Sequence, residues 1–200
     1  MANCLTEELT DDIYVDCDNL AVPGIEADIM LIAHSQVDKS ASTIDSENPN
    51  IITDLVLKSG AKGVLLEGVK QIGGFSHEFV KGDSETLNKH RHAIRGRILS
   101  PTAKNRNSYD KLATGMAYIA VVNKKYKGPD SKDAFLVLGW DTGITLATGT
   151  ESSYDNSGAI VLEMQSEDDM LENKSPKTLL ITDYETTSTA FENKFESEGD

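Results

Sequence analysis

The chain of 200 residues is 38% hydrophobic and 26% charged, which is enough apolar material for the core of one domain. Its formal net charge of −14 argues against nucleic-acid binding through a broad basic face. No run of about eighteen apolar residues is present to span a membrane. The acidic beginning lacks the basic and then apolar pattern of a secretory signal peptide. Cys4 and Cys17 are the only thiols, and we expect a reduced pair in a cytoplasmic compartment, with a disulfide as the alternative.

The first quarter of the chain is predicted to contain an arm, a strand and a loop. Residues 1–24 hold few apolar side chains and form an N-terminal arm, in which Ile13-Tyr14-Val15 is a candidate short strand. The segment from Ile25 to Val37 is predicted to be a strand, because every second residue on one face is apolar. Residues 38–50 are polar and contain a proline, so we expect a loop.

The middle of the chain contains several short apolar segments. Ile51 to Lys58 and Val64 to Lys70 are separated by Ser59 to Gly63, whose length and glycine content predict a hairpin. Two further strands are predicted at Phe75 to Lys81 and His92 to Leu99, where polar and apolar residues alternate. This period of two places both arginines of the second strand on one face.

One short helix is predicted next. Its N-terminal cap is Asn107 or Ser108, it ends near Gly115, and its apolar residues at helical spacing are Tyr109, Leu112, Ala113 and Met116. The segment from Met116 to Asn123 is apolar enough to be a strand buried on both faces. The basic loop that follows contains Gly128-Pro129 and is predicted to be the tip of a hairpin.

The stretch from Phe135 to Gln165 is predicted to be the nucleus of the sheet. Apolar runs separated by Gly, Asn and Asp, with one longer loop, are typical of a β-meander. A last strand is predicted at Thr178 to Tyr184, and residues 185–200 are predicted to be a solvated acidic tail. The whole pattern indicates a single mainly β domain over residues 1–180, an antiparallel β-sandwich or barrel with one short α-helix.

Charge is distributed unevenly along the chain. Residues 1–80 carry 14 acidic and 4 basic residues, a net −10, whereas residues 81–130 carry 4 acidic and 11 basic residues, a net +7. Residues 151–200 add 13 acidic and 3 basic residues, again a net −10. A basic middle between acidic ends favours contact with another copy of the same chain. The alternative is an acidic protein with one basic surface.

The clearest candidate for catalysis is Asp141-Thr142-Gly143, which follows an apolar run as in the aspartic-protease signature. In such enzymes two loops bring carboxylates together to share one proton, so a homodimer would have to supply the second loop. The residues that follow depart from the signature, since Ile144 leads directly into a strand. A hairpin turn containing Asp and Gly explains the same three residues without catalysis.

Other candidate sites are less specific. His77, His90 and His92 lie on predicted strands, but no cysteine pair or carboxylate completes a metal-binding spacing. The segment Gly60 to Gly63 lacks the Lys-Ser/Thr ending of a phosphate loop. A basic stretch has the composition to touch phosphate, although a surface facing the acidic ends of a neighbour is favoured; it consists of Lys89, Arg91, Arg95, Arg97, Lys104, Arg106 and Lys111. We therefore assign no catalytic, cofactor-binding or metal-ligating residue and expect no enzyme.

The order of the segments resembles a known family. It runs from Cys4-Leu5-Thr6 through one helix and a basic hairpin to Leu138-Gly139-Trp140-Asp141-Thr142-Gly143, and then to Thr148-Gly149-Thr150 and Asp155 to Gly158. This order is similar to that of the tail-tube proteins of tailed bacteriophages and covers most of residues 1–165. The acidic extension after Leu171 and the loop over residues 38–50 depart from the family pattern.

The resemblance implies a β-sandwich subunit that assembles into hexameric rings. In such tubes, neighbouring subunits join their sheets into one inner barrel, and the rings stack into a conduit through which the genome is ejected. The implied location is the virion tail, assembled in the host cytoplasm, with other copies and neighbouring tail or neck proteins as partners and DNA as non-specific cargo. Membrane insertion and cofactors are not expected. The alternatives are a ring or adaptor protein at the neck or tail end, a surface β-domain, and a dimeric aspartic peptidase centred on Asp141.

Overall fold

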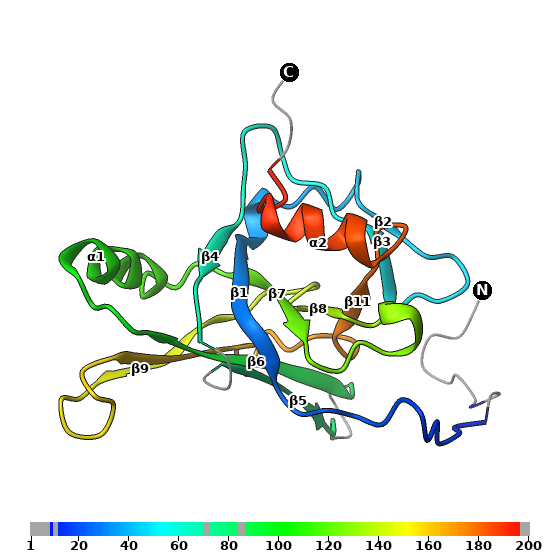
Figure 1. Cartoon of the computed structure of the whole chain (residues 1–200), viewed down its shortest axis with the longest axis horizontal. Helices are drawn as coiled ribbons and strands as arrows, with labels where there is room; N and C mark the ends of the chain where they lie inside the picture. Colours follow the sequence, from blue (N-terminus) through cyan, green and yellow to red (C-terminus); the bar gives the residue numbers. More distant parts are fainter. Residues whose placement is uncertain (1–8, 10–11, 70–72, 84–86, 197–200) are drawn as a thin grey trace.

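Two β-sheets packed face to face form the body of the protein, with one helix beside them and one helix over the larger sheet (Figure 1). The structure is a computed structural model that describes residue 9 and residues 12–69, 73–83 and 87–196. The predicted class, a mainly β sandwich, is confirmed by these two sheets.

The larger sheet has seven strands: β1 (Ile25–Ala33), β2 (Thr43–Ile44), β3 (Ile51–Asp54), β4 (Val64–Leu66), β7 (Tyr118–Lys124), β8 (Phe135–Leu138) and β11 (Lys177–Leu179). The smaller sheet has four: β5 (Gly74–Val80), β6 (Lys89–Ile98), β9 (Thr145–Glu151) and β10 (Ile160–Gln165). The helices are α1 (Ala103–Leu112) and α2 (Tyr184–Glu192), with short 3₁₀ turns η1 (His34–Gln36) and η2 (Pro129–Ser131). The strand orders are β2-β3-β11-β8-β7-β1-β4 and β5-β6-β10-β9, and only β3 and β11 pair in parallel among the described strands.

The central strands β1, β7 and β8 supply a hydrophobic core to each face of the larger sheet. On β1, Met30 and Ile32 belong to one core, whereas Ile29 and Leu31 belong to the other. Strands β7 and β8 alternate in the same way. One core lies between the two sheets and the other lies under α2, so these strands are apolar on both faces because both faces are covered.

The C-terminal segment corrects two predictions, that of a solvated tail over residues 185–200 and that of a single helix. Asp183 caps α2, since its carboxylate accepts a hydrogen bond of 2.8 Å from the N–H of Thr186. Phe191 and Phe195 are only 8% and 7% exposed and belong to the core under the helix. The many Thr, Ser and Glu residues between the aromatic ones concealed this apolar face.

The predicted hairpin between Ile51 to Lys58 and Val64 to Lys70 is also wrong. Strand β3 pairs with β2 and β11, whereas β4 pairs with β1 at the far end of the same sheet. The connection between them runs past the end of α2, where the N–H of Gly63 donates a hydrogen bond of 2.7 Å to the carbonyl of Lys194. Local turn chemistry predicted the bend but not the distant partner that holds it.

Smaller corrections concern the boundaries of elements. Helix α1 begins after Thr102, whose hydroxyl accepts a hydrogen bond of 3.3 Å from the N–H of Asn105, and not at Asn107 or Ser108. The segment Ile13 to Val15 forms no strand in the described part of the chain. Strand β11 ends at Leu179, well before the predicted end.

The predicted meander over Phe135 to Gln165 divides between the two sheets. Strands β9 and β10 pair as an antiparallel hairpin, whereas β8 belongs to the larger sheet. The chain crosses from one sheet to the other in the turn after β8, where Gly139 and Gly143 have φ of 75° and 90°. Both values lie in the left-handed region, which glycine adopts without steric strain. This turn is therefore a crossover and not a hairpin.

Replacing Phe191 with Ala should lower the free energy of unfolding by about 3–5 kcal/mol, because a buried aromatic side chain is lost from the core under α2. Urea denaturation monitored by circular dichroism measures the change. Tyr154→Ala is the matched control, since Tyr154 is 95% exposed and its removal should change stability by at most about 0.5 kcal/mol. Equal stabilities of the two variants would contradict the packing of α2.

Candidate functional site

The four-stranded sheet has two open edges. Strands β5 and β9 stand at its opposite ends, and within the described residues each pairs with one neighbour only, β6 and β10 respectively. The side chains of Ser76 to Phe79 and of Ala147 to Thr150 are exposed on these strands. Because each neighbouring pair in this sheet is antiparallel, β5 and β9 run in opposite directions. The sheet therefore ends in two unpaired edges of opposite direction.

These edges have little protection against pairing with another chain. Natural edge strands are commonly blocked by lysines, prolines, bulges or covering segments. The only charged residue of β9 is Glu151, which Arg106 of α1 holds in an ion pair with a Nη2–Oε1 distance of 2.6 Å. On β5 the only acid is Glu78, which pairs with Arg91 at 3.4 Å. One register shift lies between β9 and β10, and the remaining edge residues are small or uncharged.

The predicted basic stretch is divided between two elements. Its first half lies on β6, where Arg95 and Arg97 share the outer face of the sheet, as the period of two predicted, and Arg91 lies on the same face. Its second half, from Lys104 to Lys111, lies on α1. The sequence therefore correctly predicted that Arg95 and Arg97 lie on one face of the strand. The basic stretch as a whole, however, forms two surfaces and not one.

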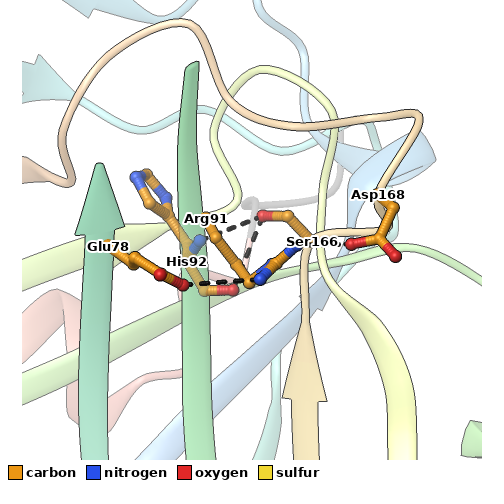
Figure 2. A network of polar contacts seen from close by, with 5 residues as sticks. All are labelled: Glu78, Arg91, His92, Ser166 and Asp168. Carbon is orange, nitrogen blue, oxygen red and sulfur yellow. Dashed lines mark hydrogen bonds and ion pairs between the residues drawn. The ribbon is translucent and has the colours of Figure 1, made fainter. Parts of the chain in front are cut away.

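Arg91 of this group forms ion pairs with two different acidic side chains (Figure 2). Its guanidinium lies between Glu78 of β5 and Asp168 of the loop after β10, and it forms an ion pair with each. Beside it, the hydroxyl of Ser166 accepts a hydrogen bond of 3.2 Å from the N–H of His92. Arg91 thus ties β5 and the loop after β10 to the central strand β6.

The three histidines lie together on the inner face of β5 and β6. His77 Nε2 is 2.7 Å from His90 Nδ1, and the ring of His92 meets that of His77 edge-on at 5.8 Å. No group of three or more His, Cys, Asp or Glu side chains in the described ranges is arranged to hold a metal ion. The structure therefore brings the three predicted candidates together as an aromatic cluster.

His92 connects the two sheets. Its Nδ1 accepts a hydrogen bond of 3.1 Å from the N–H of Gly139, and its Nε2 is 3.1 Å from the carbonyl of Lys174. These partners require a neutral ring with its proton on Nε2. The pKa of His92 is lowered to about 4, mainly by burial and in addition by the nearby His77. The neutral form is thus the one that fits the fold.

The Asp-Thr-Gly turn is bound by a buried carboxylate that the sequence analysis did not single out. Glu172 is 1% exposed and accepts hydrogen bonds from the N–H groups of Asp141, Thr142 and Gly143 at 2.7, 2.9 and 3.1 Å. The hydroxyl of Thr142 donates to the same carboxylate at 2.8 Å. In return, the Asp141 carboxylate accepts a hydrogen bond of 3.2 Å from the N–H of Asn173. Nothing in the sequence marked Glu172, which is one acid in an acidic loop.

This arrangement gives the three residues of the candidate protease signature a structural role. The Asp141 carboxylate caps a backbone N–H of its own chain, and the Asp141 carbonyl accepts a hydrogen bond of 3.0 Å from Lys39 Nζ. A peptidase would instead need this carboxylate to face a second one across a dimer. These contacts hold the turn against two other loops of the same chain. They give Asp141, Thr142 and Gly143 a structural role without catalysis.

Two sequence expectations concern the chain as a whole. No helix in the described residues is long and apolar enough to cross a membrane. Cys17 is exposed and forms no disulfide there, and Cys4 lies outside the described residues.

No protein-family model matches the chain, and neither the curated proteins nor the solved structures that were compared with it gave a match.

The stability of the fold should depend on pH through His92. Above pH 6.5 the ring is neutral in both states, so its full contribution is present. As the pH falls from 6.5 to about 4, the unfolded chain binds a proton that the folded one does not, and about 3 kcal/mol of stability is lost. Urea denaturation at pH 7, 5.5 and 4.5 measures this loss. The variant His92→Gln, which keeps His77 and His90, should show a shallower pH dependence; parallel curves would contradict this role.

Replacing Glu172 with Ala should lower the free energy of unfolding by about 3 kcal/mol or more, because three backbone N–H groups lose their acceptor. Thermal unfolding at pH 7 measures the effect. Asp169→Ala is a matched control from the same loop, because the Asp169 side chain is exposed and the N–H groups of the turn bind Glu172 instead. A variant Glu172→Ala as stable as this control would show that the turn holds its shape without the carboxylate.

Proposed function

We propose that this protein is a structural subunit of the tail tube of a tailed bacteriophage or of a phage-like particle. Copies of the chain assemble into hexameric rings, and the rings stack into the conduit for the genome. The observation that carries this proposal is the four-stranded sheet with two exposed edges of opposite direction. The order of segments in the sequence, which resembles that of tail-tube proteins, supports the same function.

The direction of the edge strands fits closure into a ring. Moving along the sheet, the strands alternate in direction from β5 through β6 and β10 to β9. The β5 strand of a rotated second copy runs opposite to β9 of the first, so it extends the antiparallel order without interruption. When this contact repeats around a closed ring, every edge strand is paired with a neighbour, so no unpaired strand edge remains. Barrels of about 16–18 strands already enclose an aqueous channel, and six copies of a four-stranded sheet exceed that number.

Charge on other surfaces fits the stacking of rings. A head-to-tail contact is heterologous, so one chain must carry two different complementary surfaces. The exposed side of α1 carries Lys104 and Lys111, whereas the loop after β10 carries Glu167, Asp168 and Asp169. These surfaces belong to the basic middle and the acidic last quarter of the sequence. Opposed charges of this kind orient one ring on the next and make their contact sensitive to salt.

The purified protein should form rings or tubes that are visible by negative-stain electron microscopy. The double variant Thr148→Lys/Thr150→Lys should reduce assembly strongly, because two lysines on the exposed edge strand β9 block pairing with a neighbour. Its matched control is Ile44→Lys, which places a lysine on β2, one of the two edge strands of the larger sheet.

Size-exclusion chromatography at increasing salt separates the two contacts. Stacked tubes should shorten toward single rings as salt rises, since the stacking surfaces are charged, whereas rings closed by backbone hydrogen bonds should persist. A protein that stays monomeric at high concentration, or a double variant that assembles as well as Ile44→Lys, would contradict the proposal. A few copies per virion in place of many would assign the chain to a single ring at the neck or tail end.

A further inference from the structure

An apolar groove lies between the end strand of the larger sheet and helix α1. Its volume is about 580 Å³, and residues of β4 and of α1 both line it. Val64, Leu65 and Leu99 on its wall are 62%, 36% and 43% exposed, which is unusual for aliphatic side chains on adjacent elements. Its floor includes Tyr109 and Leu112 of α1. The surface thus has the character of a binding groove for apolar side chains.

The edge of β4 adds backbone groups to this groove. Strand β4 is the last of its sheet and is paired only with β1, so its other side carries N–H and C=O groups without a strand partner. An extended peptide that enters such a groove can pair with the edge and place alternate side chains in the apolar wall. The groove therefore fits an extended segment with apolar residues two positions apart.

The N-terminal arm of this chain has that character. Ile13, Tyr14 and Val15 are 86%, 82% and 78% exposed, and Leu20 is 62% exposed. The hydrogen bonds of residues 12–22 join residues at most three positions apart, such as that from the Tyr14 hydroxyl to Asp12 at 2.6 Å. Ile13 and Val15 would lie on one side of an extended chain. The described part of the arm thus exposes apolar side chains that contact no core.

The arm and the groove lie on opposite sides of the same molecule. Figure 1 shows the arm leaving β1 on the side of η2 and β11, whereas α1 and β4 lie on the other side. Their charges are complementary. Residues 12–22 carry Asp12, Asp16 and Asp18 and no basic residue, whereas Lys111 lines the groove and Lys104 is exposed on the same helix. This position and this charge favour a second copy as the donor of the arm.

We propose that residues 12–22 of one copy bind in the groove between β4 and α1 of a neighbouring copy, where they extend the sheet at β4. This inference rests on the proposed self-assembly and names a contact outside the edges β5 and β9. Apolar side chains of the arm fill the groove, and the aspartates of the arm face the basic side of α1. Each subunit is thereby both a donor and an acceptor.

A fluorescent peptide of residues 12–22 tests the groove without requiring assembly. Fluorescence polarisation with the full-length protein, at a concentration where it is monomeric, should show saturable binding that salt weakens. A scrambled peptide should not bind. Val64→Asp and Leu99→Asp should each weaken binding by about tenfold or more, because they place a charge in the apolar wall. Ile44→Asp, at an exposed aliphatic position of β2, should leave binding unchanged.

Assembly of the full chain provides the second part of the test. The variant Ile13→Asp/Val15→Asp should form fewer or less salt-resistant rings or tubes than the wild type. Absence of peptide binding, or equal binding by Val64→Asp, Leu99→Asp and Ile44→Asp, overturns the arm contact even if the wild type forms tubes. Groove-dependent binding by a wild-type protein that never forms rings supports the arm contact and contradicts the tube.

Discussion

The fold depends on how one carboxylate holds the place where the chain passes between its two sheets. After β8 the backbone turns out of the larger sheet, and the N–H groups of Asp141, Thr142 and Gly143 are left without strand partners. Glu172 accepts all three, which removes the cost of burying unpaired backbone donors. His92 adds a second connection at Gly139, the first residue of the same crossover. A single buried network therefore sets the position of one sheet on the other.

That network also explains why the smaller sheet has open edges. Its two central strands, β6 and β10, supply the fully buried contacts with the larger sheet through Ile94, Leu162 and Met164, whereas Phe75 of β5 and Leu146 of β9 are only partly buried there. The outer strands β5 and β9 are carried by their neighbours and keep much of their length exposed. A sheet fixed at its centre and open at both ends presents two rigid surfaces. Rigid surfaces favour association, because little conformational entropy is lost on binding.

Sequence reasoning succeeded where the signal was local and periodic. The alternation on β6 predicted the common face of Arg95 and Arg97, and the apolar runs of β1, β7 and β8 predicted buried strands. It failed where distant segments decide the structure. The bend before Gly63 resembled a hairpin, and the Thr-rich segment before Phe191 resembled a tail, because neither sequence shows which surface it covers. Glu172 could not be found at all, since its role exists only when two loops meet.

The proposed self-assembly is consistent with where the chain satisfies its polar groups and where it leaves surfaces uncovered. The acidic and histidine side chains with the deepest burial in the described residues, Glu172 and His92, both bind backbone groups of their own chain. The one buried side-chain polar atom without a hydrogen-bond partner in the described residues is the Nε of Arg91. Outside the buried interior, unpaired strand edges and exposed apolar side chains lie on β5 and β9, in the groove beside α1 and in the described part of the N-terminal arm. Backbone pairing and apolar contact with other copies of the chain, as proposed above, would cover these surfaces.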